Sequence, residues 1–266
     1  MENSTTGLVT FADIMGWKGI WQRQGISAID NILSVKNEVT AYGRKYLAMN
    51  LYNVFRQRYP SLPERDLGTL RQDFNPMDEA IKKLKSDNAQ TNETLRADLN
   101  NLMNQNEVIL EIDLISDTFI VCITSQHKMT ALSMTALINR KLIESCLMKG
   151  LLIRGATSYG EYLKKESVFI GPAIDDAASW HEMGQEVIIF LAPSAFLNFE
   201  KEICESGEFV KRTVKLKSKT INSYCINWED PSNLFQKIAM HESPMHPEVA
   251  DKYLNTLDYL NSQRDT

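Results

Sequence analysis

The stretch EVILEIDLISDTFIVCI, residues 107–123, decides the fold class of this chain. Its first half alternates apolar and charged residues, and its second half is continuously apolar from Phe119 to Ile123. Ser116 and Asp117 are common turn residues, so they divide the stretch into two strands. The pattern predicts a β-hairpin with Asp117 at its turn.

A buried strand is also predicted upstream, in GLVTFADIM at residues 7–15. Ser27 then has the place of a helix N-cap, with Asp30 three residues on. We expect the helix that follows to turn five apolar residues inward: Ile29, Ile32, Leu33, Val35 and Val39. Residues 60–106 contain prolines and then a polar, charged stretch, which predicts a solvent-exposed helical insertion in an otherwise single domain of residues 1–266.

Strands and helices continue to alternate downstream. A long helical pattern covers residues 129–149, two strands fall within residues 150–171, a short helix within 172–184 and a strand at 186–192. The alternation in TVKLKSK predicts a strand with three lysines on one face: Lys215, Lys217 and Lys219. With at least one hairpin in this order, we expect an α+β fold, a mixed and mainly antiparallel sheet flanked by helices.

Composition limits the possible functions. The 266 residues are 43% hydrophobic and 24% charged, which suits a globular chain with a full core. The formal net charge of −5 provides no overall positive field for a nucleic-acid backbone, so we expect no nucleic-acid partner. The four cysteines lack metal-site spacing and are expected to be reduced, and no apolar run is long enough to span a membrane. A cytoplasmic location is therefore expected.

Two aspartates stand at strand ends in apolar surroundings. Asp13 ends the first strand just before Gly16, and Asp117 occupies the hairpin turn. An ionised carboxylate is costly to remove from water, so each needs a basic partner or a metal ion, or both share a divalent cation. Ordinary use of these aspartates as turn or cap residues remains the alternative.

Five motifs in order resemble those of the class III adenylate and guanylate cyclases. FADIMG resembles the first metal-binding motif, LISDTFIV the second metal-binding turn, and LLIRGATSYGEY the strand between them and the substrate helix. FIGPAIDDAASW is similar to the start of that helix, and VKLKSKTINSY to the lysine-containing strand. Within the family, the sequences RGATSYGE and IGPAIDDAA are most similar to those of the bacterial pyrimidine cyclases of the anti-phage Pycsar systems.

The resemblance implies a ferredoxin-like cyclase fold and a two-metal reaction. Two divalent ions, Mn²⁺ or Mg²⁺, would be held by Asp13, Asp117 and the backbone carbonyl of Ile14. The product would be a 3′,5′-cyclic nucleotide. The resemblance also places the phosphates of the substrate beside the glycine-rich turn and a downstream lysine: Gly16, Trp17, Lys18 and Lys217.

Two positions depart from the family pattern. Asp175 stands where the family has a ribose-binding asparagine, and Ser179 stands where it has the arginine that stabilises the transition state. Losing that guanidinium removes a donor directed at developing phosphate charge, so another cation must replace it or activity is low. Arg154 is the first choice as the replacement, although a strand arginine is more often an ordinary ion-pair partner.

The base-selecting position is also unusual. Asp113 occupies the place where adenylate cyclases have lysine and guanylate cyclases have glutamate, and Val168 replaces the aspartate that opposes it in adenylate cyclases. A carboxylate accepts hydrogen bonds, so it favours a base edge that donates them. We expect UTP as the substrate, then CTP, with a purine cyclase or a degenerate, non-catalytic nucleotide binder as the alternatives. Asp113 could also belong only to an outer strand face.

The family relationship implies partners as well. Its active sites lie between two subunits placed head to tail, which implies a homodimer with two symmetric sites. In an anti-phage system the cyclic nucleotide, cyclic UMP or cyclic CMP, would be read by a separate effector. None of the four histidines has spacing that suggests catalysis, and none is assigned to it.

Overall fold

A computed structural model describes residues 4–17, 25–58, 108–241 and 247–264 of the chain. The predicted insertion at residues 60–106 lies outside the described residues. The helices and strands, in chain order, are β1 Thr5–Ile14, α2 Ser27–Arg58, β2 Val108–Ile115, β3 Thr118–Ser125, α6 Lys128–Met148, β4 Ile153–Lys165, β5 Val168–Ile170, α7 Pro172–His181, β6 Ile189–Leu191, α8 Pro193–Asn198, α9 Glu200–Ser206, β7 Phe209–Lys215, β8 Thr220–Ile226, η2 Pro231–Asn233, α10 Leu234–His241 and α11 Pro247–Arg264.

The first four strands form a ferredoxin-like unit. The chain order β1–α2–β2–β3–α6–β4 gives the sheet order β2-β3-β1-β4, and all of these neighbours are antiparallel. The sheet then continues as β6-β8-β7, with β6 parallel to β4. The expected α+β fold, a mixed and mainly antiparallel sheet flanked by helices, is confirmed.

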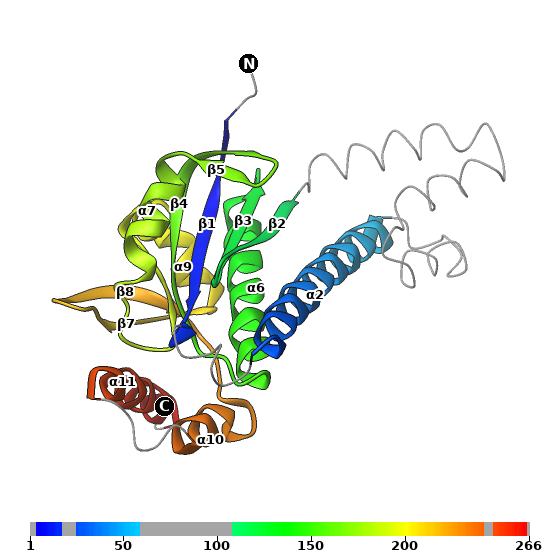
Figure 1. The fold of residues 1–266 in the computed structure, drawn as a ribbon. Helices are drawn as coiled ribbons and strands as arrows, with labels where there is room; N and C mark the ends of the chain where they lie inside the picture. Colours follow the sequence, from blue (N-terminus) through cyan, green and yellow to red (C-terminus); the bar gives the residue numbers. More distant parts are fainter. Residues whose placement is uncertain (1–3, 18–24, 59–107, 242–246, 265–266) are drawn as a thin grey trace, which may run out of the picture.

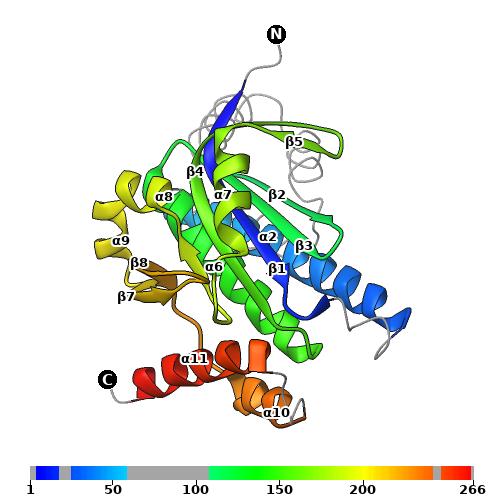
Figure 2. The ribbon, with the colours of Figure 1, turned by 60° about the vertical axis from the view of Figure 1, so that its left-hand side comes forward.

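Helices cover both faces of this sheet (Figures 1 and 2). Helices α2 and α6 pack against each other and bury the larger core against one face. Helix α7 lies across β1 and β4 on the other face, where it covers a smaller apolar cluster that includes Val9, Ile120 and Ala177. Because alternate residues of β1 point to opposite faces, Val9, Phe11 and Asp13 share the face of α7.

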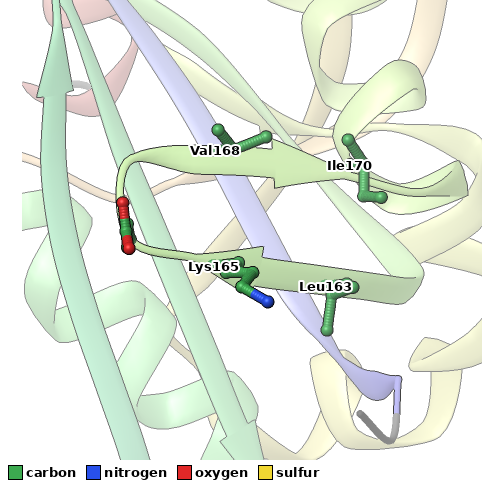
Figure 3. A pocket seen from close by; sticks show the side chains of 5 residues that line it. Leu163, Lys165, Val168 and Ile170 are labelled. Atoms are coloured by element: carbon green, nitrogen blue, oxygen red, sulfur yellow. The ribbon is translucent and has the colours of Figure 1, made fainter. Parts of the chain in front are cut away.

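The β4–β5 hairpin arches over that same face toward β2 (Figures 1 and 2). Phe169 of β5 packs into the small apolar cluster, whereas Val168 and Ile170 are more than half exposed. These two residues and Leu163 line a shallow pocket of about 290 Å³ on the side of the hairpin turned away from Phe169 (Figure 3). The hairpin therefore has one packed side and one exposed apolar side.

The predicted hairpin at residues 107–123 is confirmed. Strands β2 and β3 pair from Val108 with Ser125 to Ile115 with Thr118, which leaves Ser116 and Asp117 as a two-residue loop. Ser116 has a φ of 56°, and a positive φ at the first loop position suits the right-handed twist of a tight hairpin.

Two details of the predicted elements are wrong. Ile29 and Leu33 are 46% exposed, because each lies one residue, or about 100°, beyond the buried stripe of α2. That stripe is Ala28, Ile32, Val35 and Val39. Strand β7 ends at Lys215, so Lys217 and Lys219 lie in the turn before β8 and not on a continuous lysine face.

Among the helices that the structure describes, none combines the length and apolar character needed to cross a bilayer. All four cysteines are free, and three of them are buried in the core: Cys122, Cys146 and Cys225.

Candidate active site

Asp13 lies at the end of β1, between two strands. Its backbone is opposite Thr118 of β3 on one side and Arg154 of β4 on the other. Directly opposed residues of neighbouring strands point to the same face, so all three side chains share the face covered by α7. Only 15% of the Asp13 side chain is exposed.

Arg154 provides the cation nearest to Asp13. Its Nη2 lies 3.4 Å from Asp13 Oδ2, and its Nη1 donates a 3.0 Å hydrogen bond to the carbonyl oxygen of Gly184. The Arg154 side chain is 10% exposed, and its Nε has no hydrogen-bond acceptor among the described residues. The guanidinium is thus held between the strand end and the segment that precedes β6.

The pKa of Asp13 is raised above its ordinary value. Burial is the largest cause, and the negative charge of Asp117 adds to it. Arg154 and His181 act in the opposite direction but do not cancel the effect of burial. Asp13 is therefore a carboxylate that the fold keeps in a costly position, as carboxylates at functional sites often are.

Asp117 lies beside Asp13 although it is distant in sequence. The backbone N–H of Ile14 donates a 3.1 Å hydrogen bond to the carbonyl oxygen of Asp117, which ties the hairpin turn to the end of β1. The two carboxylates are close enough for the charge of Asp117 to raise the pKa of Asp13. The structure thus brings the predicted metal ligands Asp13, Ile14 and Asp117 together at one end of the sheet, where β1 ends and β3 begins.

The oxygen ligands at this end of the sheet fit a hard divalent cation. Two carboxylates and a backbone carbonyl are oxygen ligands of the kind that Mg²⁺ and Mn²⁺ prefer. The positive charge of a cation bound there would offset the desolvation and the repulsion from Asp117 that raise the pKa of Asp13. Among the described residues, no group of three or more His, Cys, Asp or Glu side chains is arranged as a metal site, so any ion would also need water or substrate oxygens.

His181 is a neighbour of Asp13 that the sequence did not reveal. It ends α7, its ring centroid lies 5.7 Å from that of Phe11, and its charge lowers the pKa of Asp13. The Nδ1 atom lies 2.6 Å from the carbonyl oxygen of Ala178, to which it donates. Only the path of α7 across the sheet brings this histidine to the site, and no local pattern signals it.

Three of the four residues predicted to lie beside the substrate phosphates are among the described residues. Gly16 has a φ of 76°, a conformation that glycine adopts without strain, and Trp17 packs at the edge of the larger core. Lys18 lies outside the described residues. Lys217 is in the β7–β8 turn, where its N–H donates a 2.9 Å hydrogen bond to Met183 and its ammonium lies 3.5 Å from Glu182.

The turn that carries Lys217 is linked to the aspartates through Gly184. Leu216, the neighbour of Lys217, forms a β-bridge with Gly184, and the carbonyl oxygen of Gly184 accepts the hydrogen bond from Arg154. Lys217 is therefore connected to Asp13 through the Leu216–Gly184 bridge and the Arg154 side chain. It stands at the same end of the sheet.

Asp175 and Ser179 lie on the exposed side of α7. The hydroxyl of Ser179 donates a 2.7 Å hydrogen bond to the backbone carbonyl of Asp175, one turn earlier in the same helix. The neighbouring Asp176 instead faces inward, where it accepts hydrogen bonds from Trp180 and Ser194. The two residues predicted to contact ribose and phosphate are thus separated from the aspartate pair of their own chain.

Asp113 lies on the same sheet face as Asp13 but farther along it. It is opposite Ile120, which is opposite Phe11. That register puts its backbone about 12 Å from that of Asp13, two strand spacings across and two residues along. Its carboxylate is paired with Lys36 at 3.3 Å and with Lys164 at 2.7 Å.

No family model matches the sequence, and no curated protein matches it. Solved structures do match, at low similarity. The catalytic core of a rhodopsin-guanylyl cyclase with converted specificity, in complex with ATPαS, is 12% identical with a TM-score of 0.42, over 84% of this chain and 96% of that one.

Two further structures are similar to the same degree. An adenylate cyclase from Trypanosoma brucei, solved in its monomeric state, is 11% identical with a TM-score of 0.39, over 84% of this chain and 89% of that one. A bacterial light-regulated adenylyl cyclase is 11% identical with a TM-score of 0.37, over 90% of this chain and 57% of that one.

Proposed function

We propose that this chain is a metal-dependent nucleotide cyclase of the class III type. The observation that carries the proposal is that Asp13 and Asp117 lie close together at one end of the sheet. They come from two segments whose sequences resemble the metal-binding motifs of that family. The raised pKa of Asp13 supports it, because a fold gains nothing in stability from burying a carboxylate beside a second one.

The residues at this end of the sheet would hold two divalent cations. Asp13 and Asp117 would bind them through their carboxylates, and Ile14 through its backbone carbonyl. When bound, such ions activate the attacking hydroxyl of the substrate and neutralise charge on the α-phosphate and on the leaving pyrophosphate.

Arg154 has a positioning role in this proposal. Its guanidinium is fixed between Asp13 and the carbonyl of Gly184, so it orients the carboxylate and offsets part of its charge. This placement favours support of the metal ligand over the transition-state role that the sequence suggested. Lys217 is better placed to contact the terminal phosphates, because 46% of its side chain is exposed and it shares a solvent-facing turn with Lys219.

The rest of the substrate site would come from a second copy of the chain. Asp175 and Ser179 are exposed on α7, and so they are available to a partner's nucleotide. Ile109 and Ile115, on the α7 face of β2, are 42% and 49% exposed, and apolar side chains of this kind suit a dimer contact. These exposed residues support the proposal of a homodimer with two sites.

We infer UTP as the favoured substrate and CTP as the next. The resemblance to the pyrimidine cyclases of anti-phage systems supports this choice, as does a charged base-selecting cluster around Asp113. The cyclic nucleotide would then act as a second messenger for a separate effector.

The direct test is incubation of the purified chain with each of the four nucleoside triphosphates and Mn²⁺ or Mg²⁺, with products separated by chromatography. We expect cyclic UMP above all, and a smaller amount of cyclic CMP. Cyclic product from GTP or ATP alone would replace the pyrimidine assignment with a purine one. Absence of cyclic product from all four would overturn the proposed activity.

A non-catalytic nucleotide binder is the second candidate, because Ser179 and Asp175 replace the arginine and asparagine of the family pattern. Such a protein would gain thermal stability from a non-hydrolysable triphosphate and Mn²⁺ without releasing pyrophosphate. An enzyme would show both effects, so measuring them on one preparation separates the two functions.

A further inference from the structure

The hairpin formed by β4 and β5 delivers a lysine to the base-selecting position. Lys164 of β4 lies 2.7 Å from Asp113 and donates a 3.0 Å hydrogen bond to Glu111, both of which belong to β2. Strands β2 and β4 are separated by β3 and β1 in the sheet, so only the arch of the hairpin makes this contact possible (Figures 1 and 2). The Lys164 ammonium also lies 5.3 Å from the centre of the Phe169 ring.

The resulting cluster is balanced in charge. Two carboxylates, Glu111 and Asp113, face two ammonium groups, Lys164 from the hairpin and Lys36 from α2. Burial alone would raise the pKa of Asp113, but the hydrogen bonds and charges of the two lysines hold it below its ordinary value. Burial likewise opposes the charge of Lys164, and the two carboxylates raise its pKa nonetheless. Asp113 and Lys164 are thus both charged at neutral pH.

The cluster keeps hydrogen-bonding capacity for a ligand. A lysine ammonium has three N–H donors, and one of them is given to Glu111 while the group also faces Asp113. At least one N–H is therefore left. The Lys164 side chain is 22% exposed and those of both carboxylates are 29% exposed, so each has surface that a ligand edge can reach. Asp113 Oδ2, which lies nearest to Lys164, is buried, so a ligand would reach Asp113 through its Oδ1.

We propose that Lys164 is a specificity-determining residue, which donates a hydrogen bond to the ring carbonyl of the substrate base. This inference rests on the proposed nucleotide site. It changes the chemistry of the base-selecting position, because Asp113 alone would offer only acceptors. With Lys164 beside it, the position offers a donor next to an acceptor, which matches the C=O and N–H of uracil.

The exocyclic group of the base is the feature that this pair distinguishes. Uracil and guanine carry a carbonyl oxygen there, which accepts from Lys164, whereas cytosine and adenine carry an amino group, which can only donate. Without Lys164 the carbonyl oxygen would face two carboxylates, and an amino group would still find acceptors in Glu111 and Asp113. Removal of Lys164 should therefore weaken the carbonyl-bearing bases selectively.

Binding of non-hydrolysable analogues tests the inference without requiring turnover. The dissociation constants of α,β-methylene UTP, CTP, GTP and ATP would be measured by calorimetry with Mn²⁺, for the wild type and Lys164→Met. One charge-assisted hydrogen bond corresponds to at least about tenfold in affinity, so the variant should lose about that much of the UTP-over-CTP preference. Lys164→Arg, which keeps a donor and the charge, should retain most of it.

Lys36→Met is the matched control. It removes the same charge and one ion pair of Asp113, but from the α2 side of the cluster, so the UTP-to-CTP ratio should stay within about twofold. Thermal unfolding verifies that each variant is folded, and Lys164→Leu, which also lacks a donor, replaces Lys164→Met if the latter unfolds. An unchanged ratio in the folded Lys164 variant, an equal change in Lys36→Met, or no binding of any analogue would overturn the inference.

The same preparations separate this inference from the proposed activity. If the analogues bind with a preference that depends on Lys164 but no triphosphate is cyclised, the base-contacting role stands and the cyclase assignment fails. If cyclic product forms and the preference does not depend on Lys164, the cyclase assignment stands and the role of Lys164 fails.

Discussion

Asp13 and Arg154 lie directly opposite each other on β1 and β4, and the arginine guanidinium approaches the aspartate at 3.4 Å without cancelling the effect of its burial on the pKa. An ion pair selected for stability alone would be expected to lower the pKa of its acid. The opposite direction here indicates a carboxylate that is kept in place for another purpose. The proposed binding of a divalent cation, with Asp117 as the second ligand, would provide that purpose.

Asp13→Asn and Asp117→Asn should each abolish cyclisation while the chain remains folded. Either change removes a charged ligand from the metal site, and loss of such electrostatic stabilisation lowers the rate by at least about a hundredfold. Product formation from UTP is the measurement, with thermal unfolding as the check on folding. Asp176→Asn is a suitable contrast, because that aspartate accepts hydrogen bonds within α7 and from Ser194. Activity in either site variant near that of the wild type would exclude the metal role.

The pH dependence of stability should carry the signature of Asp13. The pKa of Asp13 in the folded chain lies above its ordinary value of 3.8, so between those two values the folded state holds a proton that the unfolded chain has released. Stability due to this group is therefore highest below 3.8 and falls as the pH rises through the folded pKa. The unfolding temperature of Asp13→Asn, relative to the wild type, should accordingly increase from acidic to neutral buffer.

Mn²⁺ should act on the same group. A metal ligand must lose its proton, so the stabilisation of the wild type by Mn²⁺ should be larger in neutral than in mildly acidic buffer. Asp13→Asn should show little stabilisation at either pH. Equal stabilisation of the wild type and Asp13→Asn would mean that the ion binds elsewhere.

Arg154→Met should destabilise the metal-free protein by about 3 kcal/mol, because it leaves a buried carboxylate without its nearest cation. Added Mn²⁺ should then raise the unfolding temperature of the variant by more than that of the wild type, since the ion replaces the missing positive charge. Thermal unfolding with and without Mn²⁺ measures both effects. If Mn²⁺ stabilises both proteins equally, Arg154 and the metal do not share Asp13.

The aspartate pair was predictable because both members have local signals. Asp13 follows an apolar strand directly before a glycine-rich turn, and Asp117 occupies the only turn that the pattern of residues 107–123 allows. Their meeting followed from the resemblance to a known family, and not from spacing. The hydrogen bond from Ile14 to the carbonyl of Asp117 is the contact that joins them.

Other parts of the site depend on features that the sequence does not display. The contact of Lys164 with Asp113 arises from the curvature of a thirteen-residue strand, and the approach of His181 to Asp13 arises from the angle at which α7 crosses the sheet. Neither curvature nor crossing angle has a local sequence pattern. Lys217 was misplaced on a strand for a different reason, since alternation in VKLK continues past the last paired residue of β7.

Lys217→Ala should weaken triphosphate binding with little effect on stability. The ion pair of Lys217 with Glu182 joins side chains that are 46% and 60% exposed, so its loss should change the free energy of unfolding by less than about 0.5 kcal/mol. A lost charge-assisted contact to phosphate should raise KM for the triphosphate about tenfold. Lys201→Ala removes a comparable exposed pair, with Glu205 on α9, and should leave KM unchanged. Equal KM values for the two variants would remove Lys217 from the site.

Mixing two inactive variants should restore activity if the sites are shared between subunits. Asp13→Asn disables the metal side of its chain, and Asp175→Ala removes the outward-facing α7 residue expected to contact the nucleotide of the partner. In a random one-to-one mixture half of the dimers are mixed, and each mixed dimer has one intact site of two, so about a quarter of the wild-type activity should return.

Each variant assayed alone provides the baseline for this experiment, and the mixture must be equilibrated at a concentration where the wild type is dimeric by sedimentation. A mixture no more active than the two variants alone would place both residues in the same subunit's site. Asp175 is exposed on α7 whereas the Asp13 side chain is only 15% exposed at the end of β1, so that result would require a different position of α7 relative to β1.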